Sequence, residues 1–289
     1  MKTFTDVLLS RDHSEFSRYC AGWNKRIVHR PDFVVAASNG HHVQDAVRFA
    51  AERSLPIRVQ STGHGALAAY EGGVLIDTSA IGGIQIDPDR RIATLGAGVQ
   101  WQQLLDAAQP LGLAGLAGSS GGVGVVGYAL GGGAGWLARL YGLCSDMIEA
   151  AEITTADGVR RWVDAETEPE LLWGLRGAGS NFGIVSALRM RLVPNPIVHA
   201  GALYWPMENA GAILSAYRTW VTTVPPDMGS AVAFLQYPSA APVPEAVRGR
   251  PVVALRACHP GTAEEATAAL VSRITNIDVT SAASFDGLR

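Results

Sequence analysis

The feature that most constrains this chain is a glycine-rich run at residues 118–135, in which half of the positions are glycine. Glycine loses more backbone entropy on ordering than other residues and offers no side chain to pack, so this run is poorly suited to a long helix or strand. The apolar residues between the glycines, such as Val125 and Leu130, indicate a buried segment, because serine and charged residues dominate flexible linkers. The run favours a backbone cradle for a large ligand. A tightly packed turn without a ligand is the alternative.

The composition narrows the class of protein. Of the 289 residues, 48% are hydrophobic and 17% charged, which predicts a globular chain with a sizeable core. The net charge of −3 and the lack of a basic cluster argue against nucleic-acid binding. No apolar run has the length of a membrane span and no secretory signal is evident, so we expect a cytoplasmic protein without a membrane partner. The three cysteines are far apart and predict free thiols, and no metal site is expected.

The first half of the chain predicts a β-α-β unit. Residues 33–36 and 57–60 have the composition of buried strands, and a helix capped by Ser38 or Asn39 separates them. The small residues at 61–65 then form a loop at the carboxyl end of a strand, which is where open α/β sheets bind ligands.

Further strands and helices follow, and two prolines at 194 and 196 suggest a boundary. Beyond the boundary, a strand-helix-strand-strand-helix order predicts an antiparallel sheet backed by helices. The expected strands lie at 74–77, 84–87, 92–95, 147–155, 159–163, 184–193, 202–205, 231–237 and 252–258, and the last two helices at 210–220 and 262–274.

Two short motifs in the glycine-rich run point to other chemistries. Gly122-x-Gly124-x-x-Gly127 fits the dinucleotide pattern, which requires a preceding strand and a following helix, but Gly131 would break that helix early. Residues 118–122 fit the G-x-S-x-G pattern of a serine hydrolase. In that alternative Ser120, Asp227 and His259 would form the triad.

A longer series of motifs runs in order along residues 23–194. It includes a strand ending at Gly63-His64, an aspartate-bearing strand, the glycine-rich run and Asn181-Phe182-Gly183. The motifs lie at 58–65, 75–79, 97–101, 124–133, 141–143, 156–158, 172–177 and 181–185. Together they resemble the FAD-binding domain of flavin-dependent oxidoreductases of the vanillyl-alcohol oxidase type, in particular the berberine-bridge-enzyme-like branch.

The resemblance implies an α+β fold. Residues 1–24 would be an N-terminal extension, and residues 25–196 a PCMH-type FAD-binding domain of two α/β subdomains. Residues 197–289 would be part of a substrate domain with a helix-backed antiparallel sheet.

The resemblance also implies a covalent FAD. His64 corresponds to the residue that bonds to the flavin 8α-methyl, although a histidine merely hydrogen-bonded near the cofactor is the alternative. Ser120 stands where some relatives carry a second, cysteinyl link, so one bond is expected. Successive backbone N–H groups of the loop would hold the pyrophosphate. The loop residues are Gln60, Ser61, Thr62, Gly63 and Gly65.

The same resemblance places the glycine-rich run along the flavin ring system. Tyr128 stands where many relatives have a histidine near the ribityl chain. Val123 would lie near the oxygen-reactive face, where a small residue favours an oxidase. The implied contacts are Gly118, Ser119, Ser120, Val123, Gly124, Gly127 and Tyr128 for the ring system and Gly183 and Val185 for the adenine side.

The implied function is an FAD-dependent oxidation of a small CH–OH or amine donor by hydride transfer to flavin N5, with reoxidation by O2. The family's substrate domain is longer than residues 197–289 and carries a catalytic base, which cannot be assigned here. The alternative is therefore a truncated flavin-binding fragment with little activity, able to self-associate through an unfinished sheet edge.

Overall fold

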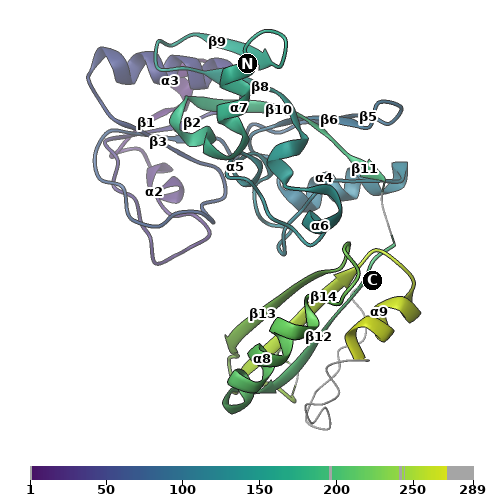
Figure 1. Cartoon of the computed structure of the whole chain (residues 1–289). Helices are drawn as coiled ribbons and strands as arrows, with labels where there is room; N and C mark the ends of the chain where they lie inside the picture. The colour runs from purple at the N-terminus through teal and green to yellow at the C-terminus, as the bar shows by residue number, and fades with distance from the viewer. Residues whose placement is uncertain (1, 195–196, 241–242, 244, 272–289) are drawn as a thin grey trace. The chain divides into compact units, whose positions relative to one another are not determined.

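The computed structural model describes residues 2–194, 197–240, 243 and 245–271. Its contacts divide the chain into two compact units, which are described separately below (Figure 1). The first unit comprises Met1–Gly135 and Leu143–Asn195, and the second comprises Trp136–Gly142 and Pro196–Arg289.

The first unit contains a four-stranded sheet of order β1-β2-β4-β3. The predicted β-α-β unit is present, but its two strands do not pair with each other, because β4 lies between them and is parallel to both. All four residues of β4 are buried, as its central place requires. Residues 1–24 contribute β1, which is antiparallel to β2. The bounds are α1 Phe4–Val7, β1 Leu8–Ser10, α2 Phe16–Tyr19, β2 Phe33–Ala36, α3 Gly40–Glu52, β3 Ile57–Gln60 and β4 Val74–Asp77.

Helix α3 packs against both sheets of the first unit. Asn39 caps it as predicted, since its side chain accepts a hydrogen bond from the His42 amide at 3.0 Å. Its buried face consists of small apolar residues, including Val43, Ala46 and Ala50, and it contacts strands β2 and β4 on one side and β8 and β10 on the other. Small side chains allow this close approach on both sides.

The second sheet of the first unit has five antiparallel strands in the order β5-β6-β10-β8-β9. The predicted hairpins β5–β6 and β8–β9 are both confirmed. The bounds are β5 Ile84–Asp87, β6 Ile92–Gly96, α4 Trp101–Ala108, η1 Gln109–Leu111, β7 Leu113–Ala114, α5 Val125–Leu130, η2 Cys144–Met147, β8 Ile148–Thr154, β9 Arg160–Asp164, α7 Pro169–Ala178, η3 Gly179–Asn181, β10 Ile184–Arg191 and β11 Val193–Pro194.

The second unit is an antiparallel sheet of order β12-β14-β13 with helix α8 packed on one face (Figure 1). Its core joins Trp205 and Leu255 of the sheet to Ile213 and Trp220 of the helix. The predicted helix-backed sheet is confirmed, although the expected helix residues 272–274 lie outside the described residues. The bounds are α6 Ala138–Tyr141, β12 His199–Pro206, η4 Met207–Asn209, α8 Ala210–Trp220, β13 Gly229–Gln236, β14 Pro251–His259 and α9 Ala263–Val271.

Candidate cofactor site

A cavity of about 580 Å³ lies within the first unit. This volume falls in the range of roughly 300–1,000 Å³ that is typical of small-molecule sites. Its wall is formed by α3, β3, α5, the end of β8 and the segment between α7 and β10. The lining residues used below are Val47, Arg58, Val59, Ser61, Thr78, Gly127, Leu130, Thr154, Thr155, Asn181, Gly183 and Val185.

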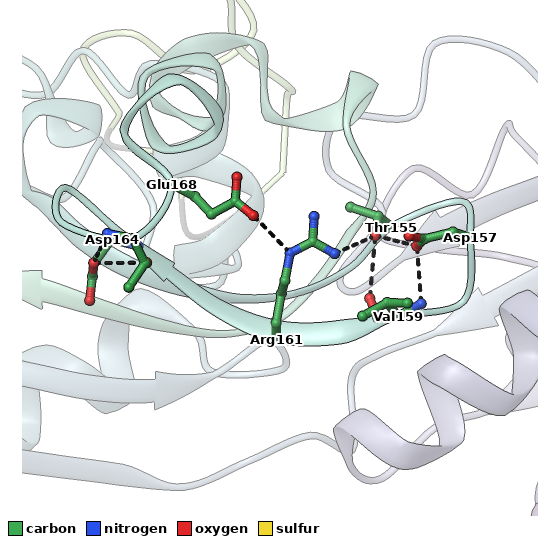
Figure 2. Close-up of polar contacts among 7 residues, drawn as sticks. Thr155, Asp157, Val159, Arg161, Asp164 and Glu168 are labelled. Carbon is green, nitrogen blue, oxygen red and sulfur yellow. Dashed lines mark hydrogen bonds and ion pairs between the residues drawn. The ribbon is translucent and has the colours of Figure 1, made fainter.

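The β8–β9 turn, whose residues Thr155 and Ala156 line this cavity, is held by several polar contacts (Figure 2). The Thr155 hydroxyl donates to the Asp157 carboxylate at 2.5 Å, and the Val159 amide donates to the same oxygen at 3.1 Å. Arg161 lies between Thr155, to which it donates at 3.0 Å, and Glu168, which is 3.3 Å from its Nε. These contacts tie the turn to the start of α7.

The loop after β3 begins at the cavity and ends at His64. Ser61 lines the cavity, and its hydroxyl donates to the Ala97 carbonyl at 3.2 Å. Gly63 has a φ of +74°, and a Cβ there would lie 2.6 Å from the Cα of Gly22. Only glycine fits this left-handed turn under the neighbouring backbone. The loop is therefore bonded to Ala97, the residue after β6, and packs closely against the segment at Gly22.

His64 has one occupied ring nitrogen and one free one. Its Nδ1 lies 2.8 Å from the Thr62 hydroxyl, whereas its buried Nε2 has no hydrogen-bond partner in the described chain. Its ring stacks on Trp23, with centroids 4.6 Å apart. Burial lowers the pKa of His64, which favours the neutral imidazole. A held, neutral imidazole with a free nitrogen can act as a nucleophile.

The two glycine-containing segments, residues 61–65 and 118–127, lie side by side. A Cβ on Gly122 would lie 3.8 Å from His64 and 3.9 Å from the Ser120 hydroxyl, and one on Gly124 would lie 3.4 Å from the Ser61 hydroxyl. The flavin prediction requires this proximity.

Several glycines of the glycine-rich run lie against the Tyr128 side chain, which leaves little room there for a Cβ atom. Cβ atoms on Gly118 and Gly133 would lie 3.1 and 2.5 Å from that ring, and one on Gly135 would lie 3.2 Å from its hydroxyl oxygen. Burial, followed by the neighbouring Cys144, raises the pKa of Tyr128 to about 12. Tyr128 is not among the residues that line the cavity. Packing without a ligand, the alternative given for the glycine-rich run, thus explains the glycines that contact Tyr128.

Gln60 anchors the loop through its side chain. The side chain contacts the His29 ring nitrogen at 3.2 Å and donates to the Tyr19 carbonyl at 3.1 Å. The Gln60 carbonyl accepts from the Thr78 amide at 2.8 Å. The amide group of Gln60 is thus occupied by protein contacts.

The remaining predicted positions fall into two groups. Gly127, Gly183 and Val185 line the cavity together with Ser61. The other positions are outside the lining, and three of them are exposed. The exposed positions are Gly65, Ser119 and Ser120.

The hydrolase alternative is not supported by the surroundings of His259. Its Nδ1 lies 3.5 Å from Asp227, as that alternative requires, but its Nε2 lies 3.9 Å from Glu265. A Cβ on Gly261 would lie 2.3 Å from the same Nε2. Backbone and a carboxylate therefore occupy the side where a serine hydroxyl such as that of Ser120 would have to bind.

The dinucleotide alternative lacks its structural context. The helix after Gly124 is α5, which has only six residues. The strand before it, β7, has two residues and pairs antiparallel with β11. The pattern requires a parallel βαβ unit, which is not found at this place.

Trp23 and Thr154 also contribute to this region, although no motif indicated either residue. Trp23 lies in the predicted N-terminal extension, where the only sequence signal was the presence of a large aromatic residue. In the structure its side chain is 65% exposed. Thr154 is an ordinary strand residue in the sequence. Only the folded chain shows it in the cavity wall.

Comparison with known proteins agrees with this geometry. Residues 31–164 match the family described as "FAD binding domain". The chain is 36% identical over 197 residues to (R)-6-hydroxynicotine oxidase of Paenarthrobacter nicotinovorans, an alignment that covers 67% of this chain and 43% of that relative. The chain thus spans less than half of the length of that relative.

Solved structures show the same fold. The crystal structure of 6-hydroxy-D-nicotine oxidase from Arthrobacter nicotinovorans superposes with a TM-score of 0.81 and 29% identity, covering 92% of this chain and 58% of that one. Xylooligosaccharide oxidase from Myceliophthora thermophila also superposes with a TM-score of 0.81, at 23% identity, covering 98% of this chain and 59% of that one.

Within residues 2–271, apart from the undescribed gaps, no helix combines the length and apolar character needed to cross a membrane. In the same described part, no three His, Cys, Asp or Glu side chains group as metal ligands would.

Proposed function

Because the chain belongs to the FAD-linked oxidoreductases of the vanillyl-alcohol oxidase type, we propose that it oxidises a small alcohol or amine with bound FAD. The observation that carries this proposal is a cavity of about 580 Å³ beside a loop that ends at His64, whose Nε2 has no hydrogen-bond partner in the described chain. The FAD-binding domain would comprise residues 25–196, and residues 197–289 would belong to a substrate domain.

The residues present fit FAD. Backbone N–H groups at residues 61–65 suit the pyrophosphate, an anion for which this acidic chain has no basic cluster. Gly183 and Val185 in the cavity wall suit the adenine half, and residues 118–127 beside His64 suit the ring system. When bound, FAD supplies a hydride acceptor at N5 and a route for electrons to O2.

His64 is the proposed covalent attachment point, through Nε2. Thr62 and Trp23 hold the ring, and a hydrogen bond from Nδ1 to the Thr62 hydroxyl would leave the lone pair on Nε2. The bond would join Nε2 to the 8α-carbon of the flavin. The imidazole and the methyl group would each give up one proton, and O2 would accept both protons and two electrons as hydrogen peroxide. With Ser120 in place of a second thiol, a single bond is proposed.

The donor class rests on the relatives. One relative is named for hydroxynicotine, an amine, and a structural neighbour for xylooligosaccharides, which are carbohydrates. An alcohol or amine carbon is thus the proposed source of the hydride.

A flavin-binding fragment with little activity is the second proposal, favoured by the coverage of 43% and 58% of the relatives' lengths. The outer sides of β12 and β13 would then be the edges available for self-association, since neither pairs with a further strand in the described chain. Self-association would appear as a size that rises with concentration.

Anaerobic reduction tests the function. The purified full chain would be mixed without oxygen with a panel of secondary alcohols, sugars and cyclic amines while its visible flavin absorption is recorded. Bleaching by one donor, reversed when air is admitted, supports the oxidase. A yellow protein that no donor bleaches but dithionite reduces supports the fragment. A colourless protein contradicts both.

A further inference from the structure

Among the side chains that line the cavity in the described chain, one buried hydroxyl has no hydrogen-bond partner. Arg58 lies over the Tyr70 ring at 5.5 Å, and the Ser61 and Thr78 hydroxyls donate to backbone carbonyls. The Thr155 and Asn181 side chains are occupied as well. The sixth polar side chain that lines the cavity is that of Thr154.

The Thr154 hydroxyl is buried without a hydrogen bond in the described chain. The residue is 0% exposed and ends β8, where it pairs with Ile184 of β10. A Cβ on Gly183 would lie 2.5 Å from the Thr154 carbonyl, so the segment at Gly183 packs directly against this residue. A buried hydroxyl without a partner costs stability, and valine would fill the same volume without that cost. A hydrogen bond from the Thr154 hydroxyl to a ligand in the cavity would offset this cost.

The lining identifies which half of the cofactor is concerned. His64, the proposed tether of the flavin ring, is outside the lining, as are Ser120 and Val123. The loop that leads to His64 starts in the wall at Ser61. The flavin end therefore belongs at His64, and the cavity is left for the AMP half.

We infer that the Thr154 hydroxyl hydrogen-bonds the adenine ring of the AMP half, an inference that rests on the proposed binding of FAD. Apolar wall residues, including Val47, Val59 and Leu130, suit a flat heterocycle. Adenine offers ring-nitrogen acceptors and an amino donor, and a threonine hydroxyl can pair with either kind. Thr154 thus supplies the polar contact that orients the ring.

Thr154→Val and Thr154→Ser test this inference in the full chain, made in a His64→Ala background so that FAD binds reversibly, and purified free of flavin from riboflavin-limited cells. Calorimetric titration with FAD, ADP and FMN is the measurement, and FMN is the control because it lacks the AMP half. Thr154→Val is expected to weaken FAD and ADP binding about five- to thirtyfold. It should leave FMN binding unchanged, and Thr154→Ser should retain most of the affinity.

The melting temperature of the flavin-free protein separates binding from folding. Because valine removes an unpaired buried hydroxyl, Thr154→Val should match or exceed the wild type. Unchanged FAD and ADP affinities in Thr154→Val overturn the inference, as does a lower melting temperature with equal losses for all three ligands. A wild-type chain that binds no FAD overturns the proposed function, and this inference falls with it.

Discussion

At the scale of single residues, the imidazole of His64 is held from two sides. Trp23 stacks on its face, and the Thr62 hydroxyl lies 2.8 Å from Nδ1. Which nitrogen carries the proton depends on the group that the other nitrogen meets. Thr62 is thus a positioning residue in the proposed attachment.

Replacing Thr62 by valine should slow covalent attachment about two- to tenfold, the effect expected for one lost hydrogen bond. Thr62→Ser, which keeps the hydroxyl, should attach flavin at close to the wild-type rate. The measurement is the fraction of flavin that stays with acid-precipitated protein after timed addition of FAD. Equal rates for Thr62→Val and the wild type would show that the hydroxyl does not position the ring.

The pH dependence of attachment should follow the lowered pKa of His64, which burial causes. Burial disfavours the charged imidazolium, so the neutral nucleophile persists to a pH below the ordinary value of about 6.5. The attachment rate should be flat above that pH and fall only below it. A rate that already declines between about pH 8 and 7 would be inconsistent with a depressed pKa.

At the scale of elements, the glycines of the run differ in what surrounds them. Gly133 has a φ of +72°, and a Cβ there would collide with Tyr128. Gly127 lies in α5 and lines the cavity, and a Cβ there would meet no atom within 4 Å. The first glycine is needed for folding, whereas the second keeps the cavity open.

Gly127→Ala should therefore raise the stability of the flavin-free protein while weakening its binding of FAD. Alanine in a helix gains about 0.5–1 kcal/mol over glycine, so the flavin-free protein should melt slightly higher. The added methyl group in the cavity wall should weaken FAD binding about tenfold by overpacking. Thermal melts measure the first effect, and FAD titration in a His64→Ala background, where binding is reversible, measures the second.

Gly211→Ala is the matched control, since Gly211 is an exposed helical glycine of α8 with no atom near its Cβ position. It should give the helix gain without any change in FAD affinity. Tight FAD binding by Gly127→Ala would show that the cofactor does not occupy this part of the cavity.

Local patterns were sufficient to predict most of these elements. The alternating and buried strands, the Asn39 cap and both hairpins depend on residues close in sequence. The position of β4 between β2 and β3 depends on contacts between residues far apart in the sequence, so no local pattern predicts it. Strand β1 has only three residues, which is too short for a periodicity to appear.

The candidate site was predictable in part. The order of motifs pointed to the loop at His64 and to the glycine-rich run, which do lie together. Side-chain direction was not predictable, because the motif that contains Gln60 does not show that its amide turns toward His29 and Tyr19. Thr154 could be found only from the cavity wall.

At the scale of the whole molecule, the chain divides into two units with separate cores. All residues that line the cavity belong to the first unit. Trp205, which is 1% exposed, is a central residue of the second core. Flavin binding and the stability of the second unit should therefore respond to different substitutions.

Trp205→Ala should destabilise the second unit by about 3–5 kcal/mol, as expected for loss of a buried tryptophan. The flavin content of the purified protein should stay close to that of the wild type. Thermal unfolding followed by circular dichroism, together with the flavin-to-protein absorbance ratio, measures both. A parallel loss of flavin would mean that cofactor retention depends on the second unit.

The mass of the intact, denatured protein shows whether FAD is bonded to His64. The wild-type chain should carry the added mass of one FAD under denaturing conditions. His64→Ala, purified in parallel, should show only the mass of its polypeptide while still binding FAD before denaturation. A wild-type chain without added mass, or a His64→Ala chain that retains it, would rule out a covalent flavin at His64.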